Sequence, residues 1–162
     1  ELLDWLNTYT FPQEARYEDT EFAKEAYSIF TEDMKKSPNT RACIFGTLHV
    51  PATEILMEQL DKTGIKAMVG KVNMDRNGSP QLQEESAQAS ADATVQWIKD
   101  TLDKFENVKP ILTPRFTPSC SDALMEKLSE IQKKYHLPMQ SHLSENFGEI
   151  AWVKELCPNT HF

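Results

Sequence analysis

The feature that most constrains the fold is a fourfold repetition of a short apolar run followed by a longer helical segment. Turn residues bound each apolar run, so residues 40–48, 65–72, 108–113 and 137–142 are predicted to be buried strands. The segments that follow have helical periodicity and lie at about 51–64, 84–105, 121–135 and 146–156. Continuous apolar strands joined by helices indicate a parallel sheet covered by helices, so the predicted class is α/β.

Residues 1–39 precede this pattern and predict a helical lead-in. Apolar residues recur at helical spacing over residues 2–9 and again over about 20–36, and Pro38 follows the second helix. The first residue is Glu1 rather than Met, so we expect the chain to be an internal segment of a larger protein. Residues 1–162 are expected to belong to one domain, with four strand–helix units over 40–162.

Two architectures contain repeated units of this kind. A doubly wound open sheet of four or five strands fits within this length, whereas a (β/α)8 barrel usually needs about 250 residues. Length therefore favours the open sheet. However, the five glycines form no Gly-x-Gly-x-x-Gly or Walker-type loop after any strand, so the usual phosphate site of open-sheet folds is missing. The residues alone leave both architectures open.

Composition argues against several classes of partner. The net charge is −8 and the Lys and Arg residues are scattered, so no nucleic-acid partner is expected. No apolar stretch approaches the roughly 18 residues of a membrane span, so no membrane association is expected. Cys43, Cys120 and Cys157 are odd in number and far apart, which favours reduced thiols and a cytoplasmic location over a disulfide framework.

The sharpest candidate site lies where the last predicted strand ends, in the sequence QSHLSE over residues 140–145. In both architectures ligands bind at the carboxyl ends of the strands. The neutral imidazole of His142 could bind zinc, and the carboxylate of Glu145 could collect a proton from a water that zinc activates. The alternative is that His142 is a hydrogen-bonded loop residue.

Other strand ends carry further candidates. The planar guanidinium of Arg115 could hold a carbonyl-bearing heterocycle or a carboxylate, and the alternative is a salt bridge to a neighbouring loop. His49 has no carboxylate close behind it in the sequence, so it is interpreted as part of a loop-to-helix connection. Asp75 is predicted to be a turn residue. Cys120 lacks an evident base, so no nucleophilic role is expected for it.

Three separated motifs occur in a fixed order: LLDWLNTYTFP over residues 2–12, TPRF with PSCS over 113–121, and QSHLSEN over 140–146. Together they resemble the guanine deaminases of the amidohydrolase superfamily, and the resemblance extends along essentially the whole chain. It implies a distorted (β/α)8 barrel, of which the four predicted strands would be strands two to five, and it makes the chain an internal segment of one catalytic barrel.

The resemblance also implies a chemistry. Guanine deaminases use one zinc ion to convert guanine and water into xanthine and ammonia, and the family resemblance implies a homodimer. Matched to the motifs, His142 corresponds to a zinc ligand and Glu145 to the glutamate that passes protons to the ring nitrogen and to the departing amino group. Arg115 and the main chain of Phe116 correspond to the segment that holds the purine, and Trp5 to the segment that covers the pocket.

The other zinc ligands of that family, a His-x-His pair, a further histidine and an aspartate, have no counterpart in these residues. One ligand cannot make a catalytic zinc site, and a barrel segment has two open sheet edges. We therefore expect the segment alone to be fragile, to bind no zinc tightly and not to deaminate guanine. Two alternatives are another amidohydrolase that deaminates a nucleobase or heterocycle, and a small non-catalytic α/β binding module.

Overall fold

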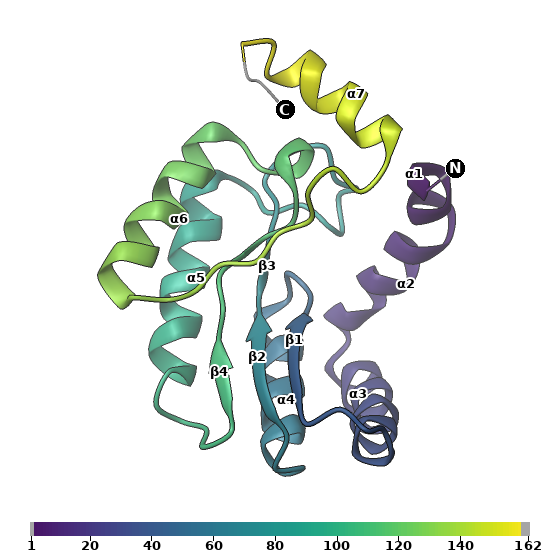
Figure 1. The fold of residues 1–162 in the computed structure, drawn as a ribbon, viewed down its shortest axis with the longest axis vertical. Coiled ribbons are helices and arrows are strands. Elements are labelled where there is room, and N and C mark those ends of the chain that lie inside the picture. Colours follow the sequence, from purple (N-terminus) through teal and green to yellow (C-terminus); the bar gives the residue numbers. More distant parts are fainter. Residues whose placement is uncertain (1, 160–162) are drawn as a thin grey trace.

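The computed structural model describes residues 2–159, and its alternating strands and helices confirm the α/β class (Figure 1). The strands are β1 (Arg41–Phe45), β2 (Lys66–Gly70), β3 (Val72–Asn73), β4 (Val108–Pro110) and β5 (Thr113–Pro114). The longer helices are α3 (Thr20–Lys36), α4 (Val50–Asp61), α5 (Ala87–Thr101), α6 (Asp122–Tyr135) and α7 (Phe147–Leu156). Short helical segments are α1 (Leu2–Trp5), η1 (Leu6–Thr10), α2 (Phe11–Ala15), η2 (Arg16–Glu18) and η3 (Thr117–Ser119).

The strands pair in parallel, in the order in which they occur along the chain. β1 pairs with β2 and β2 with β4, while β3 pairs with β5 farther along the same two runs. A parallel bridge between Leu112 and Met139 adds the fourth run beside the third. A doubly wound sheet reverses its strand order at a switch point, whereas a (β/α)8 barrel does not. Within the described residues the order never reverses, which favours a barrel segment.

Proline residues shorten the pairing of the third and fourth runs relative to the prediction. Pro110 ends β4 and Pro138 lies in the fourth run, and neither has an N–H to donate to a strand ladder. The Leu112 amide donates to the Pro138 carbonyl over 3.0 Å, and the Gln140 amide donates to the Leu112 carbonyl over 2.9 Å. The predicted strand over 137–142 is therefore an extended segment with one isolated bridge.

The helices lie in several places around the strands, and α3 packs against α4. Figure 1 shows α4, α5 and α6 along one side of the sheet, and α7 and α1 beyond the carboxyl ends of the strands. In the described part of the chain, no helix combines the length and the apolar character needed to cross a membrane. The N-terminal helices and the start of α7 thus lie at the edge of the sheet where parallel α/β folds bind ligands.

The lead-in is helical over nearly all of residues 2–36. Its main helix, α3, has the bounds that apolar spacing predicted, because Asp19 caps it: the Asp19 carboxylate accepts from the amides of Glu21 (2.9 Å) and Phe22 (3.4 Å). A carboxylate at this end of a helix also interacts favourably with the helix dipole. The cap fixes the point at which the short N-terminal segments turn toward the carboxyl ends of the strands.

The helix predicted over residues 84–105 is shorter at both ends and spans Ala87–Thr101, and Glu84 and Ser86 have partners of their own before it begins. Helix α5 begins at Ala87, and the Ser86 hydroxyl caps it by accepting from the Ala89 amide over 3.1 Å. Glu84 instead forms an ion pair with Lys71, whose side chain is fully buried beside the strands. Burial lowers the pKa of the Lys71 ammonium, and Glu84 opposes this effect. The pair ties the loop before α5 to the sheet.

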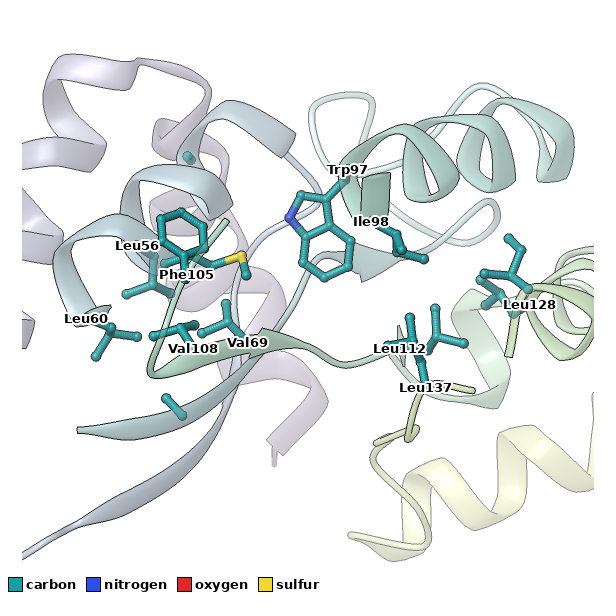
Figure 2. Packing of buried hydrophobic residues seen from close by; sticks show 14 of the residues in the cluster. Leu56, Leu60, Val69, Trp97, Ile98, Phe105, Val108, Leu112, Leu128 and Leu137 are labelled. Carbon is teal, nitrogen blue, oxygen red and sulfur yellow. The ribbon is translucent and has the colours of Figure 1, made fainter. Parts of the chain in front are cut away.

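The hydrophobic core fills the space between the strands and the helices on one side. Figure 2 shows Leu56, Val69 and Val108 next to Phe105, with Trp97 of α5 directed toward the strands. All of these side chains are at most 6% exposed. Burying one large apolar side chain stabilises a fold by about 1.5–3 kcal/mol, so this layer holds the strand ends in place.

The middle of the sheet allows no side chain at Gly70. A Cβ added there would lie 1.6 Å from the Thr113 hydroxyl oxygen and 2.9 Å from the Ile111 carbonyl oxygen. Real Cβ atoms do not approach other heavy atoms this closely, so the two neighbouring runs can only pack this tightly around a glycine. The position of the strand end at Thr113–Pro114 therefore depends on Gly70.

Candidate functional site

A cavity of about 150 Å³ lies at the carboxyl ends of the strands, between the N-terminal helices and the start of α7. Its lining includes all five residues that the sequence motifs singled out: Trp5, Arg115, Phe116, His142 and Glu145. These residues come from segments that are far apart in the chain. The structure therefore brings the predicted site residues together in one place.

His142 is held through its main chain and its ring by one carbonyl. The Arg115 carbonyl oxygen accepts from the His142 amide over 3.0 Å, and the His142 Nδ1 atom lies 2.9 Å from the same oxygen. A carbonyl only accepts, so Nδ1 carries the proton and Nε2 keeps its lone pair. The ring also packs on Phe45, with ring centroids 4.3 Å apart. His142 is thus a histidine with a fixed tautomer and a nitrogen free to bind a metal.

The guanidinium group of Arg115 forms a two-point ion pair with Glu14 of α2. Its two terminal nitrogens donate to the two carboxylate oxygens over 2.8 and 2.7 Å, and both side chains are only 12% exposed. The group also lies over the Phe11 ring, 4.7 Å from the centroid. The salt bridge that was the alternative for Arg115 is therefore present, although its partner lies on a helix rather than on a neighbouring loop.

The segment that carries Glu145 is fastened by a second glutamate, Glu149 of α7. The Glu149 carboxylate accepts from the Ser144 amide over 3.0 Å and from the Glu145 amide over 2.8 Å. Asn146 caps the helix by accepting from the Glu149 amide over 3.0 Å. Ser144 has a left-handed backbone, with φ +54°, which costs a non-glycine residue about 1 kcal/mol. Glu149 is 3% exposed and lines the same cavity.

Aromatic residues form the outer part of the site. Trp5 of α1 is 53% exposed and borders both this cavity and a neighbouring, more open one of about 630 Å³. Arg115 and His142 line both cavities. Phe116 makes an edge contact with Trp152 of α7, with ring centroids 6.1 Å apart. The two cavities therefore adjoin around Arg115 and His142, and Trp5 lies where it could cover an occupant.

Three weaker candidates have structural roles. Asp75 accepts from the Ser121 amide over 2.7 Å and from its hydroxyl, so it joins a loop to the start of α6, although the residue itself lies in irregular backbone rather than in a turn. Cys120 is 1% exposed, and burial raises the pKa of its thiol, which opposes a nucleophilic role. His49 stands immediately before α4, as a connecting residue should. Burial lowers the pKa of His49.

Sequence reasoning missed Glu14 and Glu149. Glu14 is 101 residues from Arg115 in the chain, so no local pattern could have paired them. Glu149, by contrast, follows Asn146 by three residues, and this spacing is typical of a capping box at the start of a helix. That signal could have marked Glu149, although it would have predicted a bond to the cap residue rather than to the two residues before it.

The described residues fit only part of a metal site. In the described range, no three His, Cys, Asp or Glu side chains come together in a way that could hold a metal ion. His142 nevertheless has the chemistry of a single zinc ligand, because its Nδ1 atom is hydrogen bonded and its Nε2 lone pair is available. A zinc ion at this position would require further ligands.

The amino-acid sequence matches a known family along nearly its whole length. Residues 1–161 match the model of the amidohydrolase family. The chain belongs to the amidohydrolase family. Its fold is part of an amidohydrolase (β/α)8 barrel, so the open-sheet architecture that length favoured was wrong. Chain length favoured the wrong architecture because the chain covers only part of the barrel of its relatives.

Relatives of the chain within this family are guanine deaminases. The chain is 45% identical to guanine deaminase of Rattus norvegicus over 158 residues, which are 97% of this chain and 35% of that enzyme. The solved structure of guanine deaminase from C. acetobutylicum, with guanine bound in its active site, has a TM-score of 0.96 at 48% identity and covers 100% of this chain and 38% of that one.

The E. coli guanine deaminase structure has a TM-score of 0.87 at 33% identity and covers 96% of this chain and 36% of that one. This chain therefore spans about a third of the length of the relatives that it matches.

Proposed function

We propose that residues 1–162 are an internal segment of one catalytic barrel, and that the complete protein is a zinc-dependent guanine deaminase. The proposed reaction converts guanine and water into xanthine and ammonia: a C2–O bond forms and the bond from C2 to the exocyclic nitrogen breaks. The observation that carries the proposal is the convergence of the five motif residues on one cavity at the carboxyl ends of the strands. The guanine deaminases among the relatives, one of them solved with guanine bound, support this choice of substrate.

Zinc is the metal that we propose, with His142 as one ligand through Nε2. Bound zinc would lower the pKa of a water toward about 7 and so supply the nucleophile at neutral pH. The remaining ligands are proposed to come from parts of the protein beyond these residues. We therefore expect the 162-residue segment alone to bind no zinc tightly and to have no deaminase activity.

Glu145 and Arg115 have separate roles in this proposal. Glu145 takes a proton from the attacking water, delivers it to the ring nitrogen and later protonates the departing amino group. Arg115 orients the ring. A guanidinium has five N–H donors; two bond to Glu14 and one on Nη1 bonds to the Met74 sulfur, so donors on Nε and Nη2 remain for a carbonyl oxygen of the purine. Phe116 would hold the ring through its main chain, and Trp5 would cover the occupant and exclude water.

Two variants of the complete protein test the division of labour at the site. His142→Ala should reduce zinc content, measured by atomic emission, together with the rate of ammonia release from guanine. Glu145→Gln should retain zinc and lose about 100-fold or more of kcat, because only the proton transfer is removed. Full turnover of guanine by the Glu145→Gln protein would refute the assignment of Glu145.

Substrate choice is tested by comparing ammonia release from guanine, adenine and cytosine. The proposal expects kcat/KM to be greatest for guanine. Arg115→Ala should lower that preference more than it lowers zinc content, because the guanidinium contacts the ring and not the metal. Greater kcat/KM for adenine or cytosine would favour another nucleobase deaminase of the same family.

We further propose that the complete protein is a cytoplasmic homodimer. The reduced thiols expected from three separated cysteines support the compartment, and the resemblance to guanine deaminases supports the dimer. Sedimentation of the complete protein should give twice the mass of one chain. A single-chain mass at micromolar concentration would contradict the dimer.

A further inference from the structure

We propose that Glu149 is a positioning residue for the proton-transferring Glu145, an inference that rests on the proposed function. The Glu149 carboxylate bonds the amide of Glu145 and the amide of the preceding residue, Ser144, so it fixes the main chain from which the Glu145 side chain projects. None of the sequence motifs assigns this role to Glu149.

The geometry differs from that of an ordinary helix cap. In a capping box, a glutamate at this position in the first turn bonds the amide of the cap residue, which here is Asn146. Glu149 instead bonds the two residues before the cap, over 3.0 and 2.8 Å. Those residues lie in the loop between His142 and α7. The carboxylate therefore holds the loop of the site rather than the first turn of the helix alone.

Burial makes these bonds costly to lose. Glu149 is 3% exposed, and no cationic side chain among residues 2–159 forms an ion pair with it. The two amides are thus its main compensation for removal from water, and hydrogen bonds to a charged acceptor are stronger than neutral ones. The bond to the Ser144 amide also stabilises the left-handed backbone at that residue.

The same contacts place two carboxylates and one imidazole around a single cavity. Glu145, Glu149 and His142 all line it, and the loop between His142 and Glu145 contains only two residues. A small rotation of this loop would therefore change the position of the Glu145 carboxylate relative to His142. Misplacement of a catalytic group by about 1 Å can cost about 100-fold in rate. Loss of the hydrogen bonds from Glu149 to the loop should therefore lower kcat.

The test uses the complete protein with Glu149→Gln and Glu149→Ala, and with Glu155→Gln as the matched control on the exposed face of the same helix. A glutamine keeps the shape and one acceptor, but its NH2 group faces a main-chain N–H, so one of the two bonds is lost. We expect kcat for guanine to fall about tenfold or more in Glu149→Gln and further in Glu149→Ala. KM and zinc content should stay within about threefold of wild type, and Glu155→Gln should resemble wild type.

Hydrogen–deuterium exchange provides a readout that needs no turnover. Peptides covering residues 141–149 should exchange faster in the two Glu149 variants than in the Glu155→Gln control, since the Ser144 and Glu145 amides lose their acceptor. If wild type does not deaminate guanine, the proposed function fails. The exchange measurement still tests whether Glu149 holds the Ser144 and Glu145 amides. Unchanged exchange would overturn the inference. So would a lowered unfolding temperature with kcat equal to the control, which would make Glu149 a helix cap only.

Discussion

Replacing either partner of the Glu14–Arg115 pair leaves the other as an unpaired charge that is largely shielded from water. The two side chains share two hydrogen bonds, of 2.8 and 2.7 Å, and each is 12% exposed. They also join α2 to the strand end at Thr113–Pro114, so the consequence of a substitution should extend to the packing of the lead-in helices on the sheet.

The expected magnitudes follow from burial. Removing one partner of a buried ion pair costs about 3–5 kcal/mol, whereas replacing both by apolar side chains of similar size is often nearly neutral. Glu14→Leu and Arg115→Met should each cost about 3 kcal/mol in the free energy of unfolding, and the double variant should cost about 2 kcal/mol or less. Part of that remainder is the lost contact between the guanidinium and Phe11. The coupling energy, which is the sum of the two single costs minus the cost of the double variant, should therefore be about 4 kcal/mol or more.

The assay is urea unfolding of the complete protein, followed by tryptophan fluorescence, for wild type, both single variants and the double variant. Lys62 and Glu58 supply the control: their atoms are also 2.7 Å apart, but the side chains are 69% and 55% exposed. That pair should couple by only about 0.3–0.5 kcal/mol. Additivity within about 0.5 kcal/mol at Glu14 and Arg115 would refute the claim that burial makes this pair strong.

Three further predictions concern stability. Gly70→Ala should destabilise the protein by about 2–3 kcal/mol, because the new Cβ overlaps Thr113, and the cost should shrink in a Thr113→Gly background. Gly64→Ala is a contrasting control that should cost only about 1 kcal/mol, since open space surrounds the position and only its φ of +75° opposes a side chain; urea unfolding measures both. Burial lowers the pKa of His49 below 6.5 in the folded protein. The free energy of unfolding should therefore decrease as pH falls from 6.5 toward the folded-state pKa, because only the unfolded state takes up the proton in that range. Unfolding curves of His49→Asn should show a smaller decrease over the same range. Burial raises the pKa of Tyr27 above 10.0, so stability should fall as pH rises through 10.0, where only the unfolded state ionises; equal alkaline sensitivity of wild type and Tyr27→Phe would contradict this.

The fold class and the order of elements could be predicted because they depend on local patterns. Apolar runs bounded by turn residues predicted where the strands lie, and apolar spacing followed by Pro38 predicted the bounds of α3. The predictions were less accurate where tertiary contacts decide the outcome. Glu84 forms an ion pair with the buried Lys71, so α5 starts later than periodicity predicted. Pro138 interrupts the strand pairing of the fourth run.

The architecture and the partners in the site depend on contacts between distant residues. Length and periodicity could not choose between an open sheet and a barrel, because that choice depends on the spatial order of the strands; only the resemblance carried by the three motifs implied the barrel. Arg115 was identified from its motif, but Glu14 could not be, because a pair 101 residues apart leaves no periodic signal. The residues that line the cavity were thus predictable from the motifs, while Glu14 and Glu149, which bond to them, were largely not.

The contact that sets the tautomer of His142 belongs to the main chain. Arg115 provides its carbonyl oxygen for that contact and its guanidinium for the pair with Glu14. Every amino acid has a main-chain carbonyl, so a substitution at position 115 removes the guanidinium but keeps the acceptor for His142 Nδ1. The ring recognition that we propose for the guanidinium and the orientation of the histidine are therefore genetically separable at one residue. Descendants of this protein can change the side chain at position 115 while His142 keeps the carbonyl that orients its ring and leaves its Nε2 lone pair available.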